Sequence, residues 1–191
     1  MLRVAVPNKG ILSETALLML KEAGYATRRD PKDLHVIDSK HDIEFFYLRP
    51  RDIATYVGEG SLDAGFTGLD LLRDSRSKAV AVADLRFGES TFRFAGPVGK
   101  FKDIQNLQGL RVATAYPNLV SDFLAENGVR ATVVQLDGAV ESAVKLGVAD
   151  AVADVVSTGS TLRLAGLEIF GPELLRSTAQ LICAPGKEQL S

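Results

Sequence analysis

The chain has 191 residues, of which 46% are hydrophobic, enough to build one large domain or two small ones. The 22 Lys and Arg residues against 24 Asp and Glu give a net charge of -2, so no basic excess points to nucleic acid as a partner. The sequence has neither an apolar run long enough to span a membrane nor a secretory signal pattern. The single cysteine, Cys183, excludes an internal disulfide framework. From these features we expect a cytoplasmic protein.

In the first half of the chain, short β-branched runs alternate with segments of helical period. One helix is expected from about Ser13 to a glycine stop at Gly24, and a second from Pro50 to Gly58. The stretch 61–70 is rich in turn residues and is not assigned to a strand. Strands are predicted at 2–6, 34–38, 43–48 and 79–85.

The second half repeats the rhythm without repeating the sequence. Helices are expected at 118–128 and 138–147, each with a glycine stop. Strands are predicted at 92–98, 111–115, 131–136, 150–156 and, near the C-terminus, 179–184. This alternation is typical of α/β architecture with mostly parallel sheets.

The segment 153–162, ADVVSTGSTL, is the best candidate for chemistry. An apolar strand ends at Val156, and the run 157–161 then supplies four hydroxyls and one glycine before a predicted helix. Backbone N–H groups and hydroxyls at such a place favour a phosphate. Asp154, just before this loop, suits ribose hydroxyls or magnesium. The alternative, that the loop only caps the next helix, is equally compatible with these residues alone.

Two better-known phosphate motifs are absent from the sequence. There is no G-x-x-x-x-G-K-[ST] pattern of P-loop NTPases. The run GEGSLDAG at 58–65 begins like a dinucleotide-binding fingerprint, but Asp63 stands where its third glycine belongs.

A longer pattern around the loop comprises ten positions within 22 residues: Glu141, Gly147, Ala149, Val152, Asp154, Val155, Thr158, Gly159, Thr161 and Leu162. This pattern resembles the signature of the ATP phosphoribosyltransferases, the enzymes that begin histidine biosynthesis. The resemblance also includes the segments 6–10, 44–57, 66–72, 114–120 and 136–141, and so extends through nearly the whole chain.

The resemblance implies a fold of the periplasmic-binding-protein type II, with two α/β lobes around a central cleft and two mostly parallel sheets flanked by helices. The first lobe would comprise 1–88 plus 171–191, and the second, 89–170, would carry the phosphoribosyl-binding loop. No C-terminal regulatory domain is expected, and the chain could be a truncated long form or a compact short form of the enzyme.

The implied reaction joins adenine N1 of ATP to the anomeric carbon of 5-phosphoribosyl 1-pyrophosphate and releases pyrophosphate with magnesium. The magnesium would be held mainly by the substrate pyrophosphate. The enzyme would act as a pentosyltransferase, form a dimer or larger oligomer, and could work with a regulatory subunit resembling histidyl-tRNA synthetase.

The resemblance also assigns residues to roles. Asp154, Lys9 and Arg49 are the expected catalytic residues, the two cations facing pyrophosphate or triphosphate. Tyr116 could stack on a purine or simply pack, and the role of Glu141 stays open. The expected sites for phosphoribosyl pyrophosphate are Asp154, Val155, Ser157, Thr158, Gly159, Ser160 and Thr161, and those for the nucleotide are Asp70, Ser90, Ala115 and Tyr116.

The loop departs from the family pattern at one position. Members of the family often carry arginine where this chain has Ser160, and the loss of that cation should weaken attraction for phosphate.

Two rival interpretations are weaker. Salvage phosphoribosyltransferases usually have paired acids before the loop, whereas Asp154 is followed by Val155 and Val156. A non-catalytic two-lobed small-molecule-binding module would share the architecture but does not explain the ten-position match.

Overall fold

The computed structural model describes residues 1–28, 30, 32–156 and 158–189. The chain divides into two compact units, one of Met1–Gly88 with Thr178–Ser191 and the other of Glu89–Ser177. The predicted return to the first unit, at 171, falls too early. Strand β10 (Leu167–Ser177) continues beside β6 (Ser90–Pro97) up to Ser177, and this pairing keeps the segment in the second unit.

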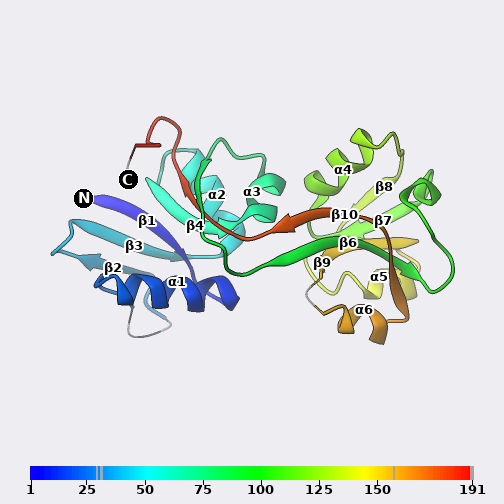
Figure 1. Ribbon diagram of the computed structural model, residues 1–191, viewed down its shortest axis with the longest axis horizontal. Coiled ribbons are helices and arrows are strands. Elements are labelled where there is room, and N and C mark those ends of the chain that lie inside the picture. Colours follow the sequence, from blue (N-terminus) through cyan, green and yellow to red (C-terminus); the bar gives the residue numbers. More distant parts are fainter. Residues whose placement is uncertain (29, 31, 157, 190–191) are drawn as a thin grey trace. The chain divides into compact units, whose positions relative to one another are not determined.

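The first unit is an α/β layer structure (Figure 1). Its six-stranded sheet has the order β2-β3-β1-β4-β11-β5. Its elements are β1 (Leu2–Pro7), α1 (Gly10–Glu22), β2 (His35–Asp38), β3 (Ile43–Leu48), α2 (Pro50–Gly58), β4 (Ala64–Gly68), α3 (Leu69–Ser75), β5 (Val80–Asp84) and β11 (Ala179–Cys183).

Strand β1 is buried on both faces over its apolar run 4–7, as such a run predicts. Val4 and Val6 pack with Leu20 of α1, whereas Ala5 faces the opposite side and packs with Ile53 of α2. Helices α1 and α2 accordingly cover opposite faces of the sheet (Figure 1). A Cβ at Gly65 would lie 2.7 Å from Cγ2 of Ile53, so glycine is required for this close helix–sheet contact.

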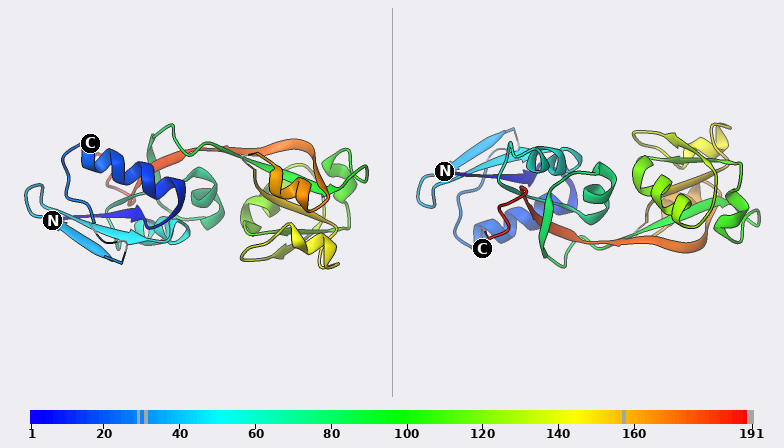
Figure 2. Two further views of the ribbon diagram at one scale, coloured as in Figure 1. Left: turned by 90° about the horizontal axis from the view of Figure 1, so that it is seen from below. Right: turned by 90° about the horizontal axis from the view of Figure 1, so that it is seen from above.

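The second unit contains a five-stranded sheet of order β10-β6-β9-β7-β8. The side-by-side course of β6 and β10 is visible from two further directions in Figure 2. Besides β10, the elements of the second unit are β6 (Ser90–Pro97), the 3-10 helix η1 (Ile104–Leu107), β7 (Arg111–Thr114), α4 (Pro117–Glu126), β8 (Thr132–Gln135), α5 (Ser142–Lys145), β9 (Ala151–Val156) and α6 (Ser160–Leu164).

The two faces of this second sheet have different cores. One face packs small and aliphatic side chains, including Ala95 and Val152, against Leu162 of α6. The other face is aromatic: the Phe94 ring lies 5.9 Å from that of Phe123 on α4 and 6.0 Å from that of Phe170. Alternation along β6 and β9 therefore separates the two cores.

Both sheets are mixed rather than mostly parallel. In the first, β1 pairs in parallel with β3 and β4, but β2 and β11 add antiparallel neighbours. The polar turn 39–42 joins β2 and β3 directly, and such a short connection can only make an antiparallel pair. In the second, β6 is antiparallel to both β9 and β10.

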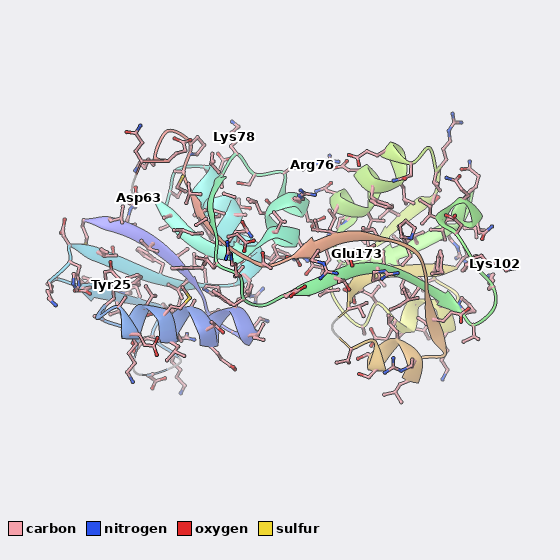
Figure 3. The ribbon with its side chains drawn as sticks, viewed as in Figure 1. Tyr25, Asp63, Arg76, Lys78, Lys102 and Glu173 are labelled. Atoms are coloured by element: carbon pink, nitrogen blue, oxygen red, sulfur yellow. The ribbon has the colours of Figure 1, made fainter. Side chains whose placement is uncertain are left out.

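The C-terminal tail is anchored by Asp63, the residue that breaks the dinucleotide-like pattern. Asp63 is labelled in Figure 3. Its carboxylate accepts a hydrogen bond from the Arg3 backbone N–H at 2.7 Å and an ion-pair hydrogen bond from Lys187. The Ala184 N–H donates to its carbonyl at 2.9 Å. These bonds fix the residues after β11 onto the start of β4.

No helix within the described ranges is long and apolar enough to cross a membrane.

Candidate functional site

The predicted residues of the second unit gather at one edge of its sheet. Strands β7 and β9 run in parallel, so Ala115 and Tyr116, after β7, leave the sheet at the same edge as Asp154. Strand β6 is antiparallel to β9, so it begins at the edge where β9 ends. Its first residue is Ser90, and the next, Thr91, pairs with Val156, the last residue of β9. The carboxyl edge of parallel strands is where α/β proteins bind ligands.

The described part of the loop after β9, residues 158–161, turns at a glycine into helix α6. Gly159 has φ 70 and ψ 8, a left-handed conformation that glycine adopts without strain. The Thr158 and Ser160 hydroxyls lie 3.0 Å apart, and helix α6 starts at Ser160, so Thr161 is in its first turn. Ser157, also expected in this loop, lies outside the described residues.

Asp154 lies near this edge, and its surroundings oppose its ionisation. Burial raises the pKa of its carboxyl group above the ordinary value of 3.8, and the negative charge of Glu141 raises it further. The hydrogen bond from the Val155 N–H to Oδ1, at 2.7 Å, acts in the opposite direction. A carboxylate in this state gains from a hydroxyl donor or a cation.

The structure adds contacts for one signature residue, Val155, and an electrostatic effect for another, Glu141. The Val155 N–H is engaged by Asp154, so its amide is already bonded within the chain. Glu141 immediately precedes α5 and makes no side-chain cap to it. Its negative charge contributes to the raised pKa of Asp154.

Tyr116 is held by packing at the start of α4. Its ring meets the Phe92 ring edge-on at 5.0 Å and 76°, and its N–H donates to the Thr114 hydroxyl at 3.0 Å. The contact with Phe92 leaves both earlier interpretations open, because a ring supported at its edge can still offer a face to a base.

In the first unit, three predicted residues likewise follow adjacent parallel strands. Lys9 comes after β1, Arg49 after β3, and Asp70 after β4. The Asn8 N–H donates to the Leu48 carbonyl at 2.8 Å, which ties the exits of β1 and β3 together. Lys9 and Arg49 are exposed, whereas Asp70, in the first turn of α3, is buried.

Arg28 joins this edge although no sequence pattern pointed to it. Its Nη2 donates to the Asn8 carbonyl at 2.8 Å, and its guanidinium carbon lies 4.6 Å from the centre of the Tyr47 ring. Its backbone N–H also donates to the Tyr47 hydroxyl, at 3.0 Å. Arg28 therefore holds the turn that presents Lys9. The signal that could have found it is a contact between distant segments, which one sequence does not contain.

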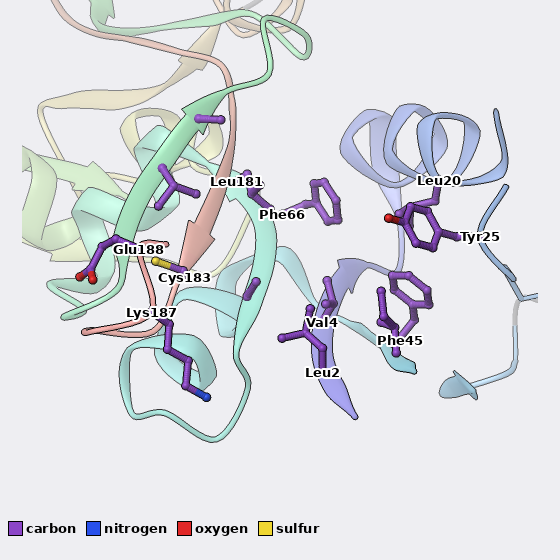
Figure 4. A pocket seen from close by; sticks show the side chains of 14 residues that line it. Leu2, Val4, Leu20, Tyr25, Phe45, Phe66, Leu181, Cys183, Lys187 and Glu188 are labelled. Carbon is purple, nitrogen blue, oxygen red and sulfur yellow. The ribbon is translucent and has the colours of Figure 1, made fainter. Parts of the chain in front are cut away.

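A cavity of about 360 Å³ lies elsewhere in the first unit (Figure 4). It opens on the sheet face beside α1, where its apolar walls include Phe45, Phe66 and Leu181, and Lys187 lies at its polar side. None of the predicted site residues lines it. Its apolar lining does not suit phosphate, so within each unit the candidate residues are those at the strand ends and not those of this cavity.

A site for a resident metal ion is not evident in the part of the chain that the structure describes. No group of three or more His, Cys, Asp or Glu side chains comes together there.

Comparisons with known proteins identify the family to which the chain belongs. The family model described as ATP phosphoribosyltransferase matches residues 49–191. An ATP phosphoribosyltransferase of Paenarthrobacter aurescens (strain TC1) is 61% identical over 186 residues, which cover 97% of this chain. The chain spans 65% of the length of that relative.

Solved structures support the fold. The ATP phosphoribosyl transferase (HisG:HisZ) complex from Thermotoga maritima matches with a TM-score of 0.86 and 29% identity, covering 100% of this chain and 90% of that one. An ABC transporter periplasmic binding protein from Brucella ovis matches with a TM-score of 0.54 and 15% identity, covering 97% of this chain and 63% of that one, a likeness of fold alone. With a family model that covers most of its length and a relative of such high identity, the chain belongs to the ATP phosphoribosyltransferase family.

Proposed function

We propose that this chain carries the catalytic core of an ATP phosphoribosyltransferase that makes N1-(5-phosphoribosyl)-ATP and pyrophosphate, the first step of histidine biosynthesis. The observation that carries the proposal is the position of Asp154 beside the loop 158–161, at the carboxyl edge of β7 and β9. A carboxylate for ribose next to a cradle for phosphate is the pair of contacts that a phosphoribosyl group needs.

The reaction is a displacement at the anomeric carbon. The lone pair of adenine N1 forms the new N–C bond, while the C–O bond to pyrophosphate breaks and its electrons leave with the pyrophosphate oxygen. The bond-forming step removes no proton from N1, so a general base is not required. The work of the protein is alignment of the two reactants and stabilisation of charge.

The second unit would bind the phosphoribosyl end. The loop residues Ser157, Thr158, Gly159, Ser160 and Thr161 would hold the 5-phosphate through hydroxyls and backbone N–H groups. Asp154 would accept hydrogen bonds from the ribose hydroxyls, with Val155 fixing its carboxylate through the 2.7 Å hydrogen bond.

The nucleotide and the leaving group would use the remaining strand ends. Lys9 and Arg49 would meet the anionic pyrophosphate or triphosphate groups. Asp70, Ser90, Ala115 and Tyr116 are the proposed nucleotide contacts.

Magnesium is proposed to enter bound to pyrophosphate oxygens, where it neutralises charge on the leaving group. In the described chain, Asp154 is the residue whose chemistry fits one further ligand position. We also propose a cytoplasmic location, where ATP is available, and self-association as a dimer or larger. The Thermotoga maritima relative was solved as a complex, and a regulatory subunit is a proposed partner here too.

The test is a spectrophotometric assay of the 191-residue chain with ATP, phosphoribosyl pyrophosphate and magnesium. Phosphoribosyl-ATP should form, should fail to form when either substrate is omitted, and should form much more slowly when Asp154→Asn replaces the wild type. If the chain neither forms product nor binds phosphoribosyl pyrophosphate in calorimetry, the proposed function is wrong. Light scattering of the same sample tests self-association, which a monomeric mass would contradict.

A further inference from the structure

The loop 158–161 contains no charged side chain, yet a guanidinium lies against it. Nη1 of Arg163 donates to the Thr158 carbonyl at 3.3 Å. The same Nη1 is 3.5 Å from the position that a Cβ at Gly159 would occupy. The positive charge therefore lies over the turn formed by Thr158 and Gly159, although the residue that carries it comes after that turn.

The local geometry explains how Arg163 reaches the turn. In a helix, side chains lean toward the N-terminus, and residues three apart share a face. Arg163 is three positions after Ser160, so its side chain extends back along α6 to the loop. The Arg163 N–H donates to the Gly159 carbonyl at 3.1 Å, which fixes the first helical turn. Gly159 has no side chain to obstruct the guanidinium.

The guanidinium is available for a ligand. Within the described residues, no ion pair includes Arg163, and its side chain bonds to a neutral carbonyl. That hydrogen bond is long, and arginine bonds to a phosphate are shorter and stronger than bonds to a neutral acceptor. An anion over the Thr158–Gly159 turn would therefore draw the guanidinium from the carbonyl.

We propose that Arg163 is the cation that binds the 5-phosphate of the phosphoribosyl substrate, in the position that Ser160 leaves without charge. The inference rests on the proposed function, since it takes the loop as the phosphate cradle. Arg163 gives the loop a preference for a phosphorylated ribose over ribose itself. Its side chain acts by direct contact with the phosphate oxygens.

The experiment measures binding of ribose 5-phosphate by calorimetry, with ribose as the uncharged comparison. Arg163→Gln should weaken binding by roughly tenfold, as expected for loss of a charge-assisted hydrogen bond. Arg163→Lys should retain part of the affinity, because it keeps the charge but not the planar fork. Arg130→Gln, which removes an exposed arginine of the same unit, should bind as the wild type does.

A second variant moves the charge instead of deleting it. The double substitution Ser160→Arg with Arg163→Ser keeps the net charge and places the guanidinium one turn earlier on the same face of α6, so it should restore binding lost in Arg163→Gln. Circular dichroism confirms that each variant is folded. The inference is overturned if Arg163→Gln binds ribose 5-phosphate as tightly as Arg130→Gln, or if the wild type does not bind it.

Turnover separates this inference from the proposed function. If ribose 5-phosphate binding depends on Arg163 but no phosphoribosyl-ATP forms from ATP and phosphoribosyl pyrophosphate, the phosphate site stands and the proposed reaction fails. If the wild type turns over and Arg163→Gln keeps the same KM for phosphoribosyl pyrophosphate, the reaction stands and the role of Arg163 fails.

Discussion

Arg28 donates a 2.8 Å hydrogen bond from Nη2 to the carbonyl oxygen of Asn8, and so connects the chain after α1 to the turn that presents Lys9. The guanidinium is itself held over the Tyr47 ring, whose hydroxyl accepts the Arg28 N–H. Tyr47 is almost completely buried, so this support is rigid. Arg28 is thus a positioning residue for Lys9, without a proposed contact to substrate.

Arg28→Gln should therefore lower both stability and substrate binding. Loss of the charge-assisted bond should cost about 1 to 2 kcal/mol in the free energy of unfolding, measured by urea denaturation. Because Lys9 is proposed to meet phosphate groups, KM for the substrate that it contacts should rise more than kcat falls. Arg130→Gln is the control for loss of one positive charge. An unchanged KM in a folded Arg28→Gln protein would contradict the positioning role.

Asp154→Asn should separate stability from activity. The pKa of Asp154 is raised in the folded chain, so its contribution to stability is present below pH 3.8 and is lost as pH rises through the raised pKa. At neutral pH the neutral Asn should thus leave the fold at least as stable as the wild type. Turnover should fall on the order of a hundredfold, since the proposed ribose contact loses its charge.

The measurements for Asp154→Asn are thermal unfolding from pH 4 to 8 and turnover at saturating substrates. Glu126→Gln, an exposed acid on α4, is the matched control. A large loss of stability at neutral pH would show that the carboxylate holds the fold together. Near-normal turnover would remove Asp154 from the mechanism.

The sequence predicted elements whose signals are local. Pro50 at the first helical position and the apolar spacing after it place α2 at Pro50–Gly58, as observed. Strand β3 is also found at its predicted residues, Ile43–Leu48, because its aromatic and branched residues favour a strand in any context.

Elements that depend on distant partners were missed. Strand β4, Ala64–Gly68, has two glycines in five residues, and its place in the sheet is fixed by β1 and β11. Strand β10 continues through Gly171 and Pro172, which would normally end a strand. It can do so because it is an edge strand and its register shifts between Phe170 and Glu173.

The helix predicted at 138–147 is shorter in the structure, where it comprises only Ser142–Lys145. Ala139 has φ 47, a left-handed backbone conformation that an α-helix does not contain, so the helix cannot begin at 138.

The positions of Arg28 and Arg163 over their respective turns depend on contacts that exist only in the folded chain. The signature residues of the candidate site were therefore readable from sequence, but the side chains that support them were not.

Asp38 should make the first unit sensitive to acid. Its carboxylate accepts hydrogen bonds from the Ala26 N–H at 2.9 Å and from the His41 ring at 2.8 Å. These bonds lower its pKa from 3.8 to about 2. Its stabilising effect is therefore complete above pH 3.8 and is lost as pH falls toward about 2.

Asp38→Asn should consequently lower the urea midpoint at pH 7, and the difference from the wild type should narrow as pH falls from 3.8 to about 2. Asp137→Asn, at an exposed acid, is the control. A difference that stayed constant across this range would show that packing of the side chain, and not its charge, causes the loss.

Glu141→Gln should change the pH dependence of the proposed reaction through Asp154. The charge of Glu141 helps to raise the pKa of Asp154, so its removal should let Asp154 ionise at lower pH. Since the ionised carboxylate is the proposed active form, activity should rise with pH through this pKa. The acid limb of the kcat/KM profile should therefore move to lower pH in Glu141→Gln, while Glu126→Gln leaves it in place. An acid limb that stays where it is, or moves upward, would assign Glu141 a role other than its charge.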